Sequence, residues 1–176
     1  MKYLKFSFLI CLFGLSLTSC KDDPEPFFTI IAEGVTFSNG DATVNLGQNA
    51  EVDFDIDNNL NADGLVNIVD GVSIANDLNL NDDGKVIIAP TSPDDTIFVF
   101  GNININDSLI ISNGTLCLNR NLNINQGGIL NVSNGANVHV QGDINTSGQI
   151  HGNRNITLNG IFNQNNGSIT EEEPLF

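Results

Sequence analysis

A repeat of about twenty residues runs through the second part of this 176-residue chain. Successive units start at a small turn residue, and the spacing of the starts is nearly constant, apart from one longer unit. The starts are Gly64, Gly84, Ser108, Gly128, Gly148 and Gly167. A fixed period of this kind is typical of proteins in which each unit packs only on its neighbours. We therefore expect a stack of similar units.

Within each unit, apolar residues recur at every second position, as in SLIISNGTLCLNRNLNINQG and GILNVSNGANVHVQGDINTS. The density of Asn, Gly and β-branched residues disfavours helix, and the alternation indicates strands. At about 3.3 Å per residue, twenty residues make one closed coil, and the next coil stacks about 4.8 Å above it. The sequence predicts an all-β parallel β-solenoid (β-helix) of about six to seven coils, each of about 20 residues.

The alternation also predicts which side chains point inward. These are Leu116 and Leu118, Val138 and Val140, Ile156 and Leu158, and Leu122, Ile144 and Phe162. Five asparagines take equivalent outward places in the third strand of successive units: Asn79, Asn104, Asn123, Asn145 and Asn163. Stacked identical amides can hydrogen-bond along the stack. We interpret the asparagines as a structural ladder rather than as binding residues.

Two parts of the chain depart from the regular repeat. The longer unit, which starts at Gly84, has a few extra residues, which we place within residues 90–95 as a loop at one corner. Before Gly64 the alternation is looser and predicts one or two irregular opening coils. An insertion on a solenoid sometimes marks a binding face, and more often it is only tolerated.

The N-terminus has the form of an export signal. Lys2 and Lys5 precede the apolar residues 6–17, a run shorter than the roughly 20 residues that span a bilayer. Residues 17–20, Leu-Thr-Ser-Cys, resemble the lipobox of bacterial lipoproteins. The resemblance implies that the signal peptide, residues 1–19, is removed and that Cys20 is the lipid attachment site. The alternative is an ordinary secreted protein with a chance cysteine at the cleavage site.

The predicted organisation follows from this anchor. Residues 20–28 form the lipidated cysteine and an acidic linker, residues 29–170 the solenoid with regular coils from residue 64, and residues 171–176 an acidic tail. Lys21-Asp22-Asp23 resembles the signal that sends some lipoproteins to the outer face of the outer membrane. We expect a lipid-anchored outer-membrane protein at the cell surface. A simple solvated tether is the alternative, which leaves open whether the anchor faces the periplasm or the exterior.

Charge and composition disfavour several classes of partner and activity. Four basic and 21 acidic residues follow the signal, a formal net charge of −17 that disfavours nucleic acid and anionic lipid as partners. A lyase acting on acidic sugars would need basic residues, and the solenoid has only Lys85, Arg120 and Arg154. The chain has no Trp, and its single tyrosine, Tyr3, leaves with the signal, so sugar stacking is disfavoured. Catalysis is the least favoured interpretation.

The G-x-[ILV]-x-[ILV] and Asn-Gly turns over residues 64–170 resemble those of short bacterial β-helix proteins of the adhesin and filamentous-haemagglutinin type. The resemblance implies the solenoid fold and says little about function, because one fold hosts many functions. We expect a non-enzymatic surface lipoprotein, adhesin-like or a structural display module, with an extracellular protein or glycan as its partner. A minor alternative is a water-ordering, ice-binding surface made by the Asn-x-Asn runs.

One segment has the spacing of a calcium loop. Oxygen-bearing residues occupy positions 1, 3, 5, 9 and 12, with Gly64 at position 6: Asn59, Asn61, Asp63, Asn67 and Asp70. This motif supports an alternative function, a calcium-dependent binder of polysaccharide or protein. Asn replaces Asp at position 1, and a second copy beginning at Asn79 fails at positions 9 and 12. We therefore favour a polar corner of the first regular coil, with no metal, and expect no cofactor.

Aligned coils are expected to place Cys117, His139 and Thr157 in one outward column. A thiolate beside an imidazole is either a metal pair or a nucleophile with its base. Two donors do not make a zinc site, and no orienting group is evident, so we interpret the column as chemically inert. No disulfide is expected, because Cys11 leaves with the signal and Cys20 is lipidated.

Overall fold

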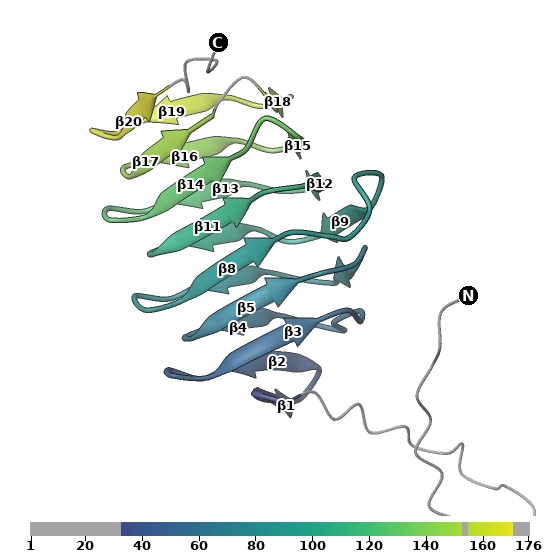
Figure 1. Cartoon of the computed structure of the whole chain (residues 1–176). Helices are drawn as coiled ribbons and strands as arrows, with labels where there is room; N and C mark the ends of the chain where they lie inside the picture. Colours follow the sequence, from purple (N-terminus) through teal and green to yellow (C-terminus); the bar gives the residue numbers. More distant parts are fainter. Residues whose placement is uncertain (1–32, 153–154, 171–176) are drawn as a thin grey trace, which may run out of the picture. The chain divides into compact units, whose positions relative to one another are not determined.

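The computed structural model describes residues 33–152 and 155–170. These residues belong to the second of two units, Met1–Ile30 and Ile31–Phe176. The signal peptide, Cys20, the acidic linker up to residue 28 and the tail 171–176 lie outside the described residues. The described part confirms an all-β parallel β-solenoid of about 20 residues per turn and about six turns, with three sheets running along the stack (Figure 1).

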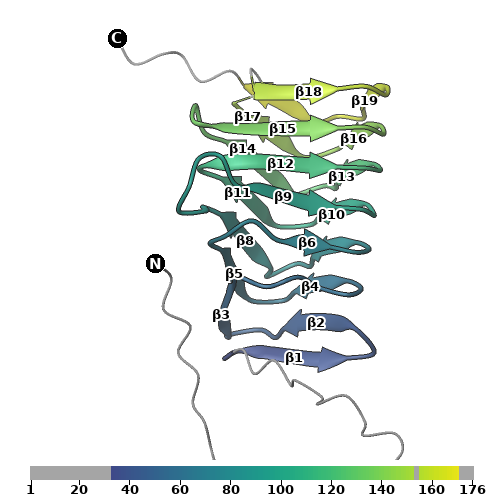
Figure 2. The same ribbon diagram turned by 90° about the vertical axis from the view of Figure 1, so that its right-hand side faces the viewer.

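Each full coil contributes one strand to each sheet, and strands of successive coils pair side by side (Figure 2). Sheet A contains β1 (Val35–Ser38), β2 (Asp41–Val44), β4 (Leu60–Ala62), β7 (Leu78–Leu80), β10 (Ile103–Ile105), β13 (Leu122–Ile124), β16 (Ile144–Thr146) and β19 (Phe162–Gln164). Sheet B contains β3 (Asn49–Val52), β5 (Leu65–Ile68), β8 (Lys85–Ile88), β11 (Ser108–Ile111), β14 (Ile129–Val132), β17 (Gln149–His151) and β20 (Ser168–Thr170). Sheet C contains β6 (Ser73–Ile74), β9 (Thr96–Val99), β12 (Gly114–Leu118), β15 (Ala136–Val140) and β18 (Ile156–Leu158).

Strand register confirms the period that the sequence predicts. In sheet B, each strand of a regular coil pairs with the equivalent strand of the next coil. The partners are Leu65 and Lys85, Lys85 and Ser108, Ser108 and Ile129, Ile129 and Gln149, and Gln149 and Ser168. The opening coil is shorter, because Asn49 pairs with Leu65, which is closer in sequence than any of these later partners. Its third side is reduced to a single bridge between Ile56 and Ile74. The looser alternation before Gly64 therefore reflects a short, two-stranded coil.

The interior is a continuous apolar column. Of the residues predicted to point inward, Leu116, Leu118, Val138, Val140, Leu122 and Ile144 are buried. Ile156 and Leu158 are half-buried against the same core. Phe162 is 39% exposed because it belongs to the last coil, above which no further coil lies in the described part of the chain. Alternation thus predicts direction correctly and does not predict the burial of an end coil.

The extra residues form a loop at the corner between sheets B and C, as expected. Residues 89–95 join β8 to β9, whereas only residues 112 and 113 join β11 to β12 one coil later. The loop turns on a bond from the Asp95 amide to the Ser92 carbonyl, at 3.2 Å. Asn113 fastens it to the next coil by donating its side-chain amide to the Pro90 carbonyl, at 2.9 Å.

Candidate functional site

The most regular surface of the solenoid is an asparagine column on sheet A. Each side-chain Nδ2 donates to the Oδ1 of the asparagine one coil earlier. The donor–acceptor pairs are Asn79 to Asn61, Asn104 to Asn79, Asn123 to Asn104, Asn145 to Asn123 and Asn163 to Asn145, at 2.8–2.9 Å. This confirms the predicted ladder and adds Asn61 to it. Each amide between the two end members donates one bond to the preceding coil and accepts one from the following coil.

A second ladder, which was not predicted from the sequence, lies at the corner where the strands of sheet A from β2 onward begin. Here a side-chain oxygen accepts the main-chain N–H of the equivalent residue one coil later, at 2.6–3.2 Å. The acceptors are Asp41, Asn59, Asp77, Asn102, Asn121 and Asp143. The signal was visible as Asn or Asp two residues before every ladder asparagine except Asn163, which has Ile161 there. At the corner no main-chain carbonyl of the neighbouring strand faces this N–H group, so a side-chain oxygen accepts its hydrogen bond instead.

Asn123 offers a direct test of the ladder. Asn123→Ala removes the bond donated to Asn104 and the bond accepted from Asn145, and it leaves two half-buried partners unsatisfied. We expect a loss of about 2 kcal/mol in the free energy of unfolding, measured by chemical denaturation. Asn163→Ala is the matched control, because the exposed Asn163 makes only one such bond. Equal losses would contradict a cooperative ladder.

The residues of the calcium motif are spread along one coil. Asn61 lies on β4 and Asn67 on β5, and Asp70 follows β5 and accepts the Gly71 amide at 2.9 Å. The side-chain oxygens of Asn59 and Asn61 accept bonds from the following coil, and Asp63 accepts the Asn81 amide at 2.6 Å. Among the residues that the structure describes, no three His, Cys, Asp or Glu gather in a metal-binding group. The calcium-loop motif stays an untested alternative, and the printed bonds of Asn59, Asn61 and Asp63 run to the following coil.

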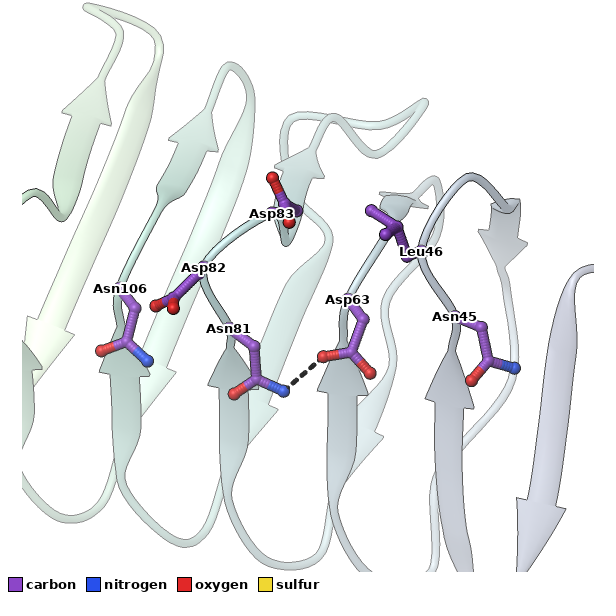
Figure 3. A pocket seen from close by; sticks show the side chains of 7 residues that line it. All are labelled: Asn45, Leu46, Asp63, Asn81, Asp82, Asp83 and Asn106. Carbon is purple, nitrogen blue, oxygen red and sulfur yellow. Dashed lines mark hydrogen bonds between the residues drawn. The ribbon is translucent and has the colours of Figure 1, made fainter.

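An open acidic groove lies at the corner between sheets A and B, with a volume of about 690 Å³. Its lining is Asn45, Leu46, Asp63, Asn81, Asp82, Asp83 and Asn106. Figure 3 shows that the three carboxylates come from two neighbouring corners and do not converge on one point. The groove carries negative charge near solvent, which disfavours anionic ligands there.

The predicted column of Cys117, His139 and Thr157 exists on sheet C. Register pairs Phe98 with Cys117, Cys117 with His139, and His139 with Thr157. Burial raises the pKa of the Cys117 thiol above its ordinary value of 9.0, so the thiol stays protonated at neutral pH. Nucleophilic attack and metal binding both require the thiolate. The direction of this shift is opposite to that of a reactive cysteine.

Sheet C combines an uncharged face with two exposed aromatic rings. Its five strands contain no Asp, Glu, Lys or Arg, although the chain is strongly acidic. Phe98 and Phe100 are 44% and 48% exposed, and their rings lie 6.3 Å apart at 18° to each other. This pair was not predicted from composition, in which only Trp and Tyr were weighed as stacking residues. Sheet C is the candidate contact face, with aromatic, hydroxyl and amide groups and no charge.

Comparisons with protein-family models, with curated proteins and with solved structures give no match. Within residues 33–152 and 155–170, no helix has the length and apolar character needed to cross a bilayer. Fold, register and surface chemistry are therefore the basis for a functional proposal.

Proposed function

We propose that this chain is a non-enzymatic surface lipoprotein, an adhesin-like or structural display module anchored through lipid on Cys20. The lipobox-like residues 17–20 and the following Lys21-Asp22-Asp23 support the anchor and the outer-membrane, cell-surface location. The observation that carries the display role is the regular solenoid itself. An amide ladder joins its coils along sheet A from β4 to β19, which supports a stiff scaffold.

Sheet C is the face that we propose contacts an extracellular protein or glycan. The asparagines of sheet A bind each other, whereas the side chains of Thr115, Asn137 and His139 make no hydrogen bond to other described residues. Asn137 and His139 are exposed and Thr115 is half-buried, and Phe98 and Phe100 add exposed apolar area beside them. An uncharged face suits a partner without strong charge, because the acidic corners repel anions.

Lipid attachment is tested by metabolic labelling of the producing bacterium with radioactive palmitate. We expect label on the wild-type chain and none on Cys20→Ser, which should leave the membrane fraction. Cys117→Ser is the matched control, because Cys117 lies within the solenoid, and it should keep the label. Labelled Cys20→Ser, or unlabelled wild type, would overturn the anchor.

Surface display and the contact face have separate tests. Protease added to intact cells should degrade the solenoid, and complete protection in cells with an intact outer membrane would defeat surface location.

Adhesion of the bacteria to host-derived or bacterial surfaces should fall at least about tenfold when Phe98 and Phe100 are both changed to Ala. The control is Ile110→Ala, an outward substitution on sheet B that should leave adhesion unchanged.

A further inference from the structure

The two ends of the solenoid are built differently. At the N-terminal end, β1 folds back and pairs antiparallel with β2, so the edge of sheet A is covered (Figure 2). Gly34 lies against the first strand of sheet B, close enough that a Cβ there would meet the Asn49 carbonyl oxygen. At the C-terminal end, the last strands are β18, β19 and β20, and no described strand pairs with their outer edges. The first core residues at the N-terminal end, Ala42, Val44, Ala50 and Val52, are at most 3% exposed, whereas the C-terminal end presents three strand edges.

The open end also exposes the last layer of the core. An apolar opening of about 260 Å³ is lined by Ile144, Ile150, Ile156, Leu158, Phe162 and Ile169. Phe162 and Ile169 are 39% and 36% exposed, whereas Ile144 and Ile150, at the same positions one coil earlier, are 2% and 1% exposed. Ile161, at the adjoining corner, is 64% exposed. Open strand edges around exposed apolar side chains are a template for further strand pairing.

We propose that a second copy of this chain docks on this surface, C-terminal end to C-terminal end. Three strand edges arranged around an apolar layer need a partner with the same arrangement, and the same end of another copy has it. The N-terminal end does not, because its apolar layer is already buried and β1, the outermost strand of sheet A there, runs antiparallel to β2. A two-fold axis across the stack places β19 against β19 of the second copy and β18 against β20, all antiparallel. Both copies then bury Phe162 and Ile169.

This geometry gives a closed dimer. The contact is isologous, since each copy uses the same patch, and it leaves no open C-terminal end from which a filament would grow. The N-terminal ends, whose apolar layer is buried, point away from the contact. In the proposed dimer the exposed edge strands pair with each other. Association stops at two copies, whereas a head-to-tail contact would permit unlimited growth.

Charge gives the dimer a distinctive dependence on salt. Each copy carries a formal charge of −17 after the signal, and Glu171, Glu172 and Glu173 follow β20 directly in the sequence. Two such copies repel each other at low ionic strength. Screening shortens from about 10 Å at 0.1 M salt to about 3 Å at 1 M, so added salt should tighten the dimer. An interface held by ion pairs would weaken instead.

Sedimentation equilibrium on the Cys20→Ser full chain after export tests the proposal. We expect a dimer whose dissociation constant falls as NaCl is added. Ile169→Asp should raise that constant at least about tenfold, because it buries a charge in the apolar contact. Leu46→Asp is the control: Leu46 is 68% exposed in the groove between sheets A and B, and its substitution should leave the dimer intact.

Hydrogen exchange provides a second measurement that does not depend on a variant. Amides of β18, β19 and β20 should exchange more slowly as the wild-type concentration rises, while those of β1 stay unchanged. A monomer at every concentration would overturn the proposal, as would a dimer that Ile169→Asp leaves intact. A monomer that associates only after removal of residues 171–176 would also overturn it and would assign the cover to the chain's own tail.

Discussion

Changing Gly84 to alanine is expected to cost about 3 kcal/mol in the free energy of unfolding, a large effect for one methyl group. Gly84 is buried at the turn before β8. A Cβ built there would lie 1.9 Å from the carbonyl oxygen of Ala62 in the coil below. The neighbour is main chain that already takes part in coil-to-coil bonding, so it has no rotamer by which to move away. The coils would have to separate locally.

Gly135→Ala is the control for this substitution. Gly135 lies in the exposed connection between β14 and β15, and a Cβ there would have no neighbour within 4 Å. We expect a change within about 0.5 kcal/mol. Chemical denaturation of both variants measures the difference. Equal losses would show that the close approach of the coils at Gly84 does not explain the effect, because the reduced flexibility of the unfolded chain favours folding at both sites.

Leu109→Ala is expected to cost about 3 kcal/mol by the same measurement. Leu109 is fully buried on β11, in a central coil, where the coils above and below hold the cavity open. Ile110, the next residue, faces outward and is half-buried, so Ile110→Ala should cost about 1 kcal/mol. The two substitutions remove similar side chains from one strand and differ only in the face to which they belong.

The outcome of this pair also tests the strand register. A shift by one residue would move every side chain of β11 to the opposite face. Ile110→Ala would then be the more damaging change. That result would contradict the pairing of Leu109 with Val86 and Leu130.

The fold could be predicted because two periods agree along the chain. The alternation of apolar residues fixes the faces of each strand, and the spacing of turn residues fixes the length of a coil. Equivalence between units therefore predicts one column for Asn79, Asn104 and Asn123 from the sequence alone. Asn61 precedes Gly64, where the regular repeat begins, so the repeat does not predict its place in the column.

Features that depend on the ends and on three-dimensional neighbours could not be predicted in the same way. Phe162 has the sequence environment of a core residue, and its exposure follows only from its position in the last coil. The adjacent rings of Phe98 and Phe100 form a surface because sheet C has no charged side chains around them. The exposure of Phe162 and the aromatic surface of Phe98 and Phe100 both depend on neighbouring coils, so the sequence of a single repeat does not predict them.

The loop of residues 89–95 shows where this architecture accepts change. It lengthens the coil between Lys85 and Ser108, yet the pairing of Ser108 with Lys85 and of Leu116 with Ile97 continues on either side. Stacking is therefore insensitive to the length of this corner. A foreign peptide grafted between Pro93 and Asp94 should be carried on the solenoid without loss of its fold, which makes the corner a site for epitope presentation in engineered variants.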